Sequence, residues 1–289
     1  SKIELMSKIL IVGAGDVGGR IALELAELGH EVWALRRRPQ AGQSFAGGGT
    51  LRWLSADVTK AETLKLPVGL DMVVSALAPS ESGMAAYEQV YVGGAQALQQ
   101  ALKGQSLHRQ FWLSSTGVYG EDAGEWIDEA TPALPKRDTA KLLLQAEDVV
   151  RQSSWPSTIV RLGGLYGPGR ERLLRWVREG KPVQMNPPSW TKRLHVADAA
   201  SLVVHLVQQS LAGVSIEPLL LGVDDEPVPQ HVVLAWLAQQ LELPILPEKA
   251  VEPNASQGKR IRNLAMHRSG YALRYPSFRD GYLTLLPKM

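Results

Sequence analysis

The feature that most constrains the fold is a short apolar run followed at once by a glycine-rich loop. Residues 9–12 read I-L-I-V, an unbroken aliphatic stretch that indicates a strand buried on both faces. Gly13, Gly15 and Gly18 follow directly, and apolar residues then recur at helical spacing over 17–28. A second strand-like run comes next. The order strand, glycine loop, helix, strand predicts a β-α-β unit.

The glycine spacing G-x-G-x-x-G, placed between a strand and a helix, is typical of a loop that binds a dinucleotide. The first glycine permits the tight turn, the second lets the backbone approach a pyrophosphate, and the third lets helix and strand pack closely. The amino terminus of the helix offers free N–H groups and partial positive charge to the phosphates. The structural alternative is a glycine-rich turn without a ligand.

The end of the second strand indicates which dinucleotide binds. An NAD site usually has an acidic residue there, which binds the ribose 2′-hydroxyl. Here Arg36, Arg37 and Arg38 stand at this place, and no carboxylate occurs over 32–56. Because an arginine can pair with a 2′-phosphate through charge-assisted hydrogen bonds, the sequence favours NADP over NAD. We expect at least one of the three arginines to be a solvated loop residue.

Two further strand ends extend the predicted cofactor site. Asp57 and Val58 end the third strand, at the carboxyl edge where ligands bind in such sheets. Asp57 either accepts a hydrogen bond from the adenine amino group or caps a helix that begins at Thr59. Small residues over 76–78 would let the cofactor pass close to the backbone. We assign cofactor binding to Gly13, Gly15, Asp16, Val17, Gly18, Arg36, Arg37, Asp57, Val58, Ala76, Leu77, Ala78 and Ser114.

Strand-like runs alternate with helical segments along the first part of the chain. We expect strands near 31–35, 51–56, 72–77, 110–114 and 157–162, and helices near 85–102 and 139–150. This alternation predicts an α/β fold, a Rossmann-type doubly wound parallel sheet. In the less regular second half we expect helices at 170–179, 196–209 and 232–241, a strand at 218–223, and short helices capped by Asn263 and Ser277.

This organisation suggests two regions. Residues 7–163 would form the dinucleotide-binding core, and residues 164–289 would hold the remainder of the sheet, interleaved with a small C-terminal α/β lobe that binds substrate.

Composition excludes several classes of function. The chain has 289 residues, no cysteine and a formal net charge of +2, so disulfides, thiolate nucleophiles and cysteine-bound zinc are ruled out. The charge is too small for a dedicated nucleic-acid or membrane-surface binder. The six histidines show no metal-binding spacing, so we expect no metal. Residues 1–6 lack the apolar run of a signal peptide, so we expect a cytoplasmic protein without membrane contact.

Three later segments resemble one family. Residues 114–120 read S-S-T-G-V-Y-G and look like its S-S-x-x-V-Y-G segment. Residues 161–169 look like its R-P-x-N-x-Y-G-P-G segment, and 193–198 like its R-x-x-H-V-x-D segment. The chain thus resembles the extended short-chain dehydrogenase/reductases, in their epimerase/dehydratase branch. The resemblance implies a nicotinamide beside a small-molecule substrate, such as a nucleotide-sugar, and a homodimer formed through helices 85–102 and 139–150.

The family's catalytic pair, Tyr-x-x-x-Lys, is incomplete here. Ser115 falls on the family's substrate-orienting serine, and Lys141 falls near its lysine. Four residues before Lys141 stands Arg137 rather than tyrosine, and a register shifted by two gives Thr139 and Leu143. No tyrosine occurs over 120–165. The resemblance therefore implies catalytic roles for Ser115 and Lys141, but it supplies no tyrosine acid/base.

Two smaller departures mark an atypical member. The glycine spacing is not the family's usual G-x-x-G-x-x-G, and Gly164 stands where the family often has asparagine.

Other groups could replace the tyrosine, and each also has a structural interpretation. Tyr119 would pack in its turn, Lys141 would be a surface lysine, and His195 would be a hydrogen-bonded structural histidine. Four loop carboxylates qualify by position alone: Glu121, Asp122, Glu125 and Asp128. Trp126 and Trp190 would lie on loops, and the basic run 259–262 would either face an anionic substrate or be solvated.

Two hypotheses on function remain open. The chain is either an NAD(P)-binding oxidoreductase or epimerase/dehydratase-like enzyme with a non-standard acid/base, or an NADP-binding sensor without turnover. Retained Ser115 and Lys141 favour the enzyme, and the missing tyrosine favours the sensor.

Overall fold

The computed structural model describes residues 6–287, which form two compact units. Within this range, the first comprises 6–119, Ala133–Arg161 and Ala200–Leu220, and the second comprises Gly120–Pro132, Leu162–Ala199 and 221–287. The expectation about a signal peptide concerns mainly residues 1–5, which lie outside the described range. No helix within 6–287 has the length and apolarity that a bilayer span requires.

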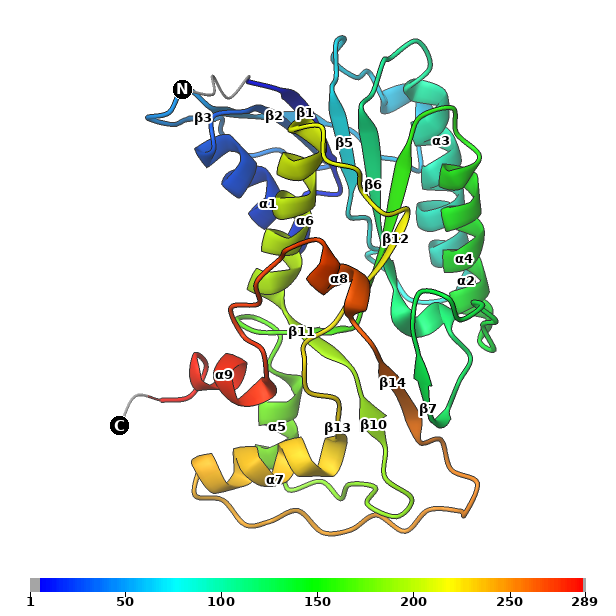
Figure 1. The fold of residues 1–289 in the computed structure, drawn as a ribbon, viewed down its shortest axis with the longest axis vertical. Helices are drawn as coiled ribbons and strands as arrows, with labels where there is room; N and C mark the ends of the chain where they lie inside the picture. The colour runs from blue at the N-terminus through cyan, green and yellow to red at the C-terminus, as the bar shows by residue number, and fades with distance from the viewer. Residues whose placement is uncertain (1–5, 288–289) are drawn as a thin grey trace. The chain divides into compact units, whose positions relative to one another are not determined.

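The first unit is built on a large sheet (Figure 1). Over the described residues this sheet has eight strands in the order β12-β8-β6-β5-β1-β2-β4-β3. They are β1 (Lys8–Val12), β2 (Glu31–Arg36), β3 (Gln43–Ser44), β4 (Thr50–Ser55), β5 (Met72–Ser75), β6 (Arg109–Ser115), β8 (Ser157–Leu162) and β12 (Leu219–Gly222). β1 pairs in parallel with both β2 and β5, β2 pairs in parallel with β4 and β5 with β6, whereas the short β3 runs antiparallel to β4. The Rossmann-type parallel sheet predicted from the sequence is confirmed.

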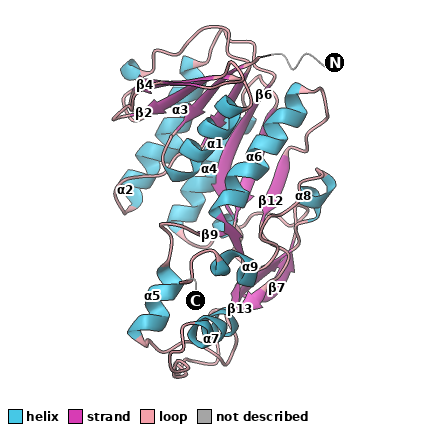
Figure 2. Ribbon diagram, turned by 90° about the vertical axis from the view of Figure 1, so that its left-hand side faces the viewer, coloured by secondary structure: helices cyan, strands magenta, loops and turns pink. Residues whose placement is uncertain are grey.

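Helices cover both faces of this sheet (Figure 2). They are α1 (Asp16–Glu27), α2 (Met84–Tyr87), α3 (Gly94–Ala101), α4 (Asp138–Arg151) and α6 (Val196–Leu211), with a π-helical turn, Glu88–Gly93, joining α2 to α3. A hydrogen bond of 3.1 Å from the Ser201 hydroxyl to Glu24 joins α6 to α1. α3 and α4 pack together on the other face. The sheet is thus doubly wound, and residues 9–12 of β1 are fully buried between the two helical layers.

The second unit has a small sheet of four short strands, in the order β13-β10-β14-β7 over the described residues. These are β7 (Ala123–Ile127), β10 (Trp190–Thr191), β13 (Val228–Pro229) and β14 (Gly258–Ile261), while β9 (Gly164–Tyr166) pairs with β11 (Arg193–His195). Its helices are α5 (Arg172–Glu179), α7 (Gln230–Gln240), α8 (Leu264–Arg268) and α9 (Phe278–Leu283). The sequence pattern predicted none of these strands, because runs of two to five residues show no clear periodicity.

Some local expectations are confirmed and others are wrong. Ser277 caps α9 in a capping box with Asp280, as predicted. Asn263 precedes α8 but does not cap it with its side chain, because its amide donates to Asp225 Oδ1 at 2.8 Å instead. Trp126 and Trp190 lie on β7 and β10 rather than on loops.

Candidate functional site

A cavity of about 630 Å³ lies at the carboxyl ends of β1, β2, β4 and β5 in the first unit. The register explains its position, because Val12 at the end of β1 pairs with Leu35 on β2 and with Ser75 on β5. The chain therefore leaves all these strands at one edge of the sheet. Nine of the residues assigned to cofactor binding line the cavity: Gly13, Gly15, Arg36, Arg37, Asp57, Val58, Ala76, Leu77 and Ala78.

The three glycines of the loop have different surroundings. Gly13 has a φ of +84°, and a Cβ there would lie 2.6 Å from the carbonyl oxygen of Ala76. A Cβ on Gly18 would overlap the carbonyl oxygen of Gly13. A Cβ on Gly15 would meet nothing within 4 Å. Gly13 and Gly18 thus serve the packing of strand, loop and helix, whereas Gly15 leaves open space at the amino terminus of α1.

Four other assigned residues do not line the cavity. The Asp16 carboxylate accepts a hydrogen bond of 3.0 Å from Arg20, one turn along α1. Val17 and Gly18 are buried in the packing of α1. The Ser114 hydroxyl donates to Glu147 at 2.6 Å and is held away from the cavity. Sequence reasoning missed Glu81, Gln89 and Val90, which line the cavity from the segment before α2 and from the π-helical turn.

The polar groups at the ends of β2 and β4 are mainly basic. Arg36 is the last residue of β2, and it lines the cavity with Arg37 and Arg38, all three exposed. Asp57 faces the same space. Partial burial raises the pKa of the Asp57 carboxyl, but hydrogen bonds from Thr59 and the charge of Arg37 outweigh it and lower that pKa. The positive charge of this wall suits a phosphate group.

The local fold around Asp57 differs from one of its two predicted roles, the helix cap. Asp57 Oδ1 accepts the N–H of Thr59 at 2.9 Å and its hydroxyl at 2.7 Å, which closes a tight turn. No helix begins at Thr59, and a single 3₁₀ turn, Ala61–Thr63, follows. The capping role is therefore wrong as stated, although the carboxylate is engaged by local donors.

Ser115 and Lys141, the residues assigned to catalysis, come from different elements. Ser115 ends β6, and its Oγ accepts the N–H of Gly117 at 3.0 Å. Lys141 lies on α4 with its side chain 59% exposed, 3.5 Å from Asp138. Within residues 6–287 no hydrogen bond links Ser115 to Lys141, and no tyrosine lies on α4.

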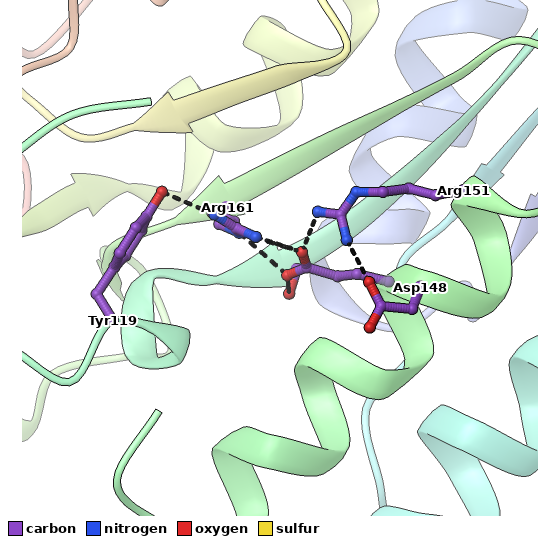
Figure 3. A network of polar contacts seen from close by, with 6 residues as sticks. Tyr119, Asp148, Arg151 and Arg161 are labelled. Carbon is purple, nitrogen blue, oxygen red and sulfur yellow. Dashed lines mark hydrogen bonds and ion pairs between the residues drawn. The ribbon is translucent and has the colours of Figure 1, made fainter. Parts of the chain in front are cut away.

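A buried polar network lies beside the end of β6 (Figure 3). Glu147 on α4 has no solvent exposure, and its carboxylate accepts hydrogen bonds of 2.6 Å from both Arg161 and Arg151. Arg161 also donates to the Tyr119 hydroxyl at 2.7 Å. Burial lowers the pKa of the Arg161 guanidinium, but the bonds and charge of Glu147 outweigh it and raise that pKa. Tyr119 is therefore buried and hydrogen-bonded, as one interpretation of the sequence held. Ser114, which donates to Glu147, and Asp148, which accepts a hydrogen bond of 2.9 Å from Arg151, complete the network.

Sequence reasoning did not single out Glu147. The available signal was its spacing, because Glu147 lies three residues before Val150, on the buried face of α4 with Ala140 and Ala146. A carboxylate on such a face needs a cationic partner. Only the fold identifies that partner as Arg161, on β8.

Comparison with known proteins gives the family. A family model described as NAD(P)H-binding matches residues 13–210, more than half of the chain. A solved structure from Methylobacillus flagellatus, described as a candidate NAD-dependent epimerase/dehydratase, is 36% identical, with 97% of this chain and 98% of that chain covered and a TM-score of 0.80. The chain belongs to the NAD(P)H-binding epimerase/dehydratase family.

Two other solved structures share this fold. A conserved protein of unknown function from Silicibacter pomeroyi is 25% identical, with 97% of this chain and 98% of that chain covered and a TM-score of 0.71. A double mutant of DesIV, a dTDP-glucose 4,6-dehydratase from Streptomyces venezuelae with NAD bound, is 20% identical, with 96% and 94% covered and a TM-score of 0.74. A search of curated proteins found no match.

This member of the family also has buried polar groups in its second unit. His195 is 3% exposed, its Nδ1 accepts the N–H of Ala197 at 3.0 Å, and its ring lies 4.1 Å from that of Tyr275. His195 is thus buried and hydrogen-bonded, as its structural interpretation requires. Burial raises the pKa of the Asp224 carboxyl to about 7, although the charge of buried Arg193 opposes this.

The basic run 259–262 was expected either to face an anionic substrate or to be solvated, and it is only partly solvated. Lys259 is buried, and the Arg260 guanidinium lies 4.4 Å from the ring of Trp190 and 5.1 Å from that of Trp126. Arg260 also donates to the carbonyl oxygen of Gly124 at 2.8 Å. These cation–π contacts join β7, β10 and β14. Of the four carboxylates expected on a loop, Glu125 lies on β7, because this segment pairs with β14, while Glu121, Asp122 and Asp128 flank that strand in the same unit.

Proposed function

We propose that this protein is an NADP-dependent enzyme of the epimerase/dehydratase family that acts on a small polar substrate with a non-standard acid/base. The observation that carries the proposal is the position of Arg36. This residue ends β2 and lines the same cavity as Gly15, above whose backbone the space is open. Arg36, with Arg37, would hold the 2′-phosphate, and the loop would hold the pyrophosphate. Bound there, a nicotinamide dinucleotide would supply hydride transfer.

The other assigned residues have supporting roles in this proposal. Asp57 and Val58 would lie against the adenine, and the small side chains of Ala76 and Ala78 would let the dinucleotide pass the end of β5. Ser115 would donate a hydrogen bond to the substrate oxygen, and Lys141 would lie on the substrate side of α4. DesIV, whose fold this chain shares, is named for a nucleotide-sugar substrate. That substrate class is the one we would screen first.

Calorimetric titration with NADPH and, separately, NADH tests the proposed cofactor. We expect Arg36→Ala to raise the Kd for NADPH by about 10- to 100-fold, the worth of one charge-assisted hydrogen bond, and to leave NADH binding little changed. Arg52→Ala is the matched control, because Arg52 is also exposed on the large sheet but lies outside the cavity. Equal losses for the two cofactors would refute the role of Arg36.

A sensor without turnover is the second candidate function. The observation that favours it is the absence of a tyrosine from described helix α4, where the family has its acid/base. Oxidation of NADPH with any member of a panel of carbonyl compounds, nucleotide-sugars included, would decide for the enzyme. Tight NADPH binding without turnover across the panel would decide for the sensor.

A further inference from the structure

Ser115 and Arg137 converge on one point above the backbone of Gly117. A Cβ built on Gly117 would lie 3.2 Å from Ser115 Oγ and 3.6 Å from Arg137 Nη2. All three residues belong to the first unit, so their mutual placement is part of one compact body. A hydroxyl and a guanidinium therefore flank a space that is clear only because residue 117 has no side chain.

Both side chains have hydrogen-bond donors that are not used within the protein. Ser115 Oγ accepts the N–H of Gly117, but within residues 6–287 the Ser115 hydroxyl donates to no acceptor. The Arg137 side chain is exposed, and the described part of the chain offers its guanidinium no hydrogen bond or ion pair. Each can thus donate to a ligand oxygen without breaking an existing bond.

The position of Arg137 in the chain is unfavourable for the helix that it precedes. Arg137 is the N-cap residue of α4, with extended backbone (φ −83°, ψ 141°) and no capping bond from its side chain. Ser, Thr, Asp and Asn are the residues that stabilise this position, and a cation is disfavoured at the positive end of a helix. Local stability does not explain an arginine here, whereas an anionic ligand would.

The pair lies at the same edge of the sheet as the cavity. β5 and β6 run in parallel with Ser75 paired to Trp112, so both strands end at the carboxyl edge. Residues 76–78, which follow β5, line the cavity, and Ser115 ends β6 on the neighbouring strand.

We propose that Arg137 and Ser115 form a carboxylate-binding subsite of the substrate site, and hence that the substrate carries a carboxylate. This rests on the proposed function, which puts the cofactor in the adjacent cavity. A carboxylate has two oxygens, one for the guanidinium and one for the hydroxyl, and it is planar enough to lie over a glycine. In this arrangement Arg137 occupies part of the place of the missing tyrosine but binds a fixed negative charge instead of moving a proton.

The test is calorimetric titration of oxalate, an unreactive dicarboxylate, into the protein saturated with NADP⁺. We expect the Kd for oxalate to rise about 10- to 100-fold in Arg137→Gln, as one charge-assisted contact is lost, and less in Arg137→Lys. Gly117→Ala places a methyl group on the convergence point and should weaken binding to a similar degree. Arg178→Gln, an exposed arginine on α5, is the matched control and should bind oxalate like the wild type.

The outcomes separate this proposal from the proposed function. Titration of each variant with NADP⁺ alone comes first. A wild type that does not bind NADP⁺ overturns the proposed function, whereas one that binds NADP⁺ but not oxalate overturns only the subsite. Equal oxalate affinity in Arg137→Gln and the wild type also overturns the subsite. Inorganic phosphate that binds through Arg137 where oxalate does not would overturn the assignment to a carboxylate. Thermal unfolding of Gly117→Ala is the control for folding. A melting temperature like that of the wild type assigns any loss of oxalate affinity to the subsite.

Discussion

Single alanine substitutions in the glycine loop should separate its binding role from its packing role. Gly15, Gly18 and Gly19 lie within five consecutive residues, yet their surroundings differ. A Cβ on Gly15 would meet no protein atom within 4 Å, one on Gly18 would overlap the Gly13 carbonyl oxygen, and one on Gly19 would lie 3.8 Å from the carbonyl oxygen of Ala14. Gly15→Ala therefore tests a position with open space, Gly18→Ala a position with no room for a methyl group, and Gly19→Ala a position with ordinary van der Waals contact.

Gly15→Ala should change the free energy of unfolding by no more than about 0.5 kcal/mol, because the methyl group touches nothing. The same methyl group would stand where a pyrophosphate approaches the backbone, and the loss of one charge-assisted contact costs about 1.5–3 kcal/mol. We therefore expect the Kd for NADPH to rise by about 10- to 150-fold. The loss should be equal for NADH, because both cofactors share the pyrophosphate.

Gly18→Ala should lower the free energy of unfolding by about 1–3 kcal/mol, because the carbonyl of Gly13 cannot move without shifting β1 from α1. Gly19→Ala should raise it by up to about 1 kcal/mol, since alanine is the better helix former in α1 and has room. Gly19 does not line the cavity, so this variant should bind NADPH like the wild type.

Urea denaturation and calorimetry on the same preparations check these expectations. Wild-type affinity in Gly15→Ala would refute the proposed position of the pyrophosphate. A Gly18→Ala protein as stable as the wild type would refute the packing argument.

Two further predictions concern buried charges. Glu147→Ala should lower the free energy of unfolding by about 3–5 kcal/mol, because Arg161 would stay buried without its partner. Urea denaturation measures this free energy, and a loss below about 1 kcal/mol would contradict the prediction. Because the pKa of Asp224 is raised to about 7 in the folded state, the native protein holds a proton that the unfolded chain releases near its ordinary value of 3.8. Asp224 thus makes the free energy of unfolding fall as pH rises between those two values. A plot of the free energy of unfolding against pH should therefore fall less over this range for Asp224→Asn than for the wild type, and parallel plots would refute the raised pKa.

The candidate site was predictable where it depends on short stretches of chain. The glycine spacing, the strand before it and the helix after it are consecutive, so their pattern predicts the β-α-β unit. Parallel strands place their carboxyl ends together, which is why Arg36, Asp57 and residues 76–78 could be assigned to one site before the fold was known. Val17 and Ser114, expected at the same site, do not line the cavity, because Val17 is buried in the packing of α1 and the Ser114 hydroxyl donates to Glu147 across to α4.

The sequence by itself determined the parallel sheet, the position of the glycine loop and the basic end of β2, because each follows from local periodicity, backbone freedom or charge. Only the tertiary structure decided which distant groups meet. It buried Glu147 against Arg161, placed Arg260 over the rings of two tryptophans, and brought Arg137 near Ser115, 22 positions earlier in the chain. Such contacts depend on how elements pack across many residues, and a single sequence carries no periodic signal for them.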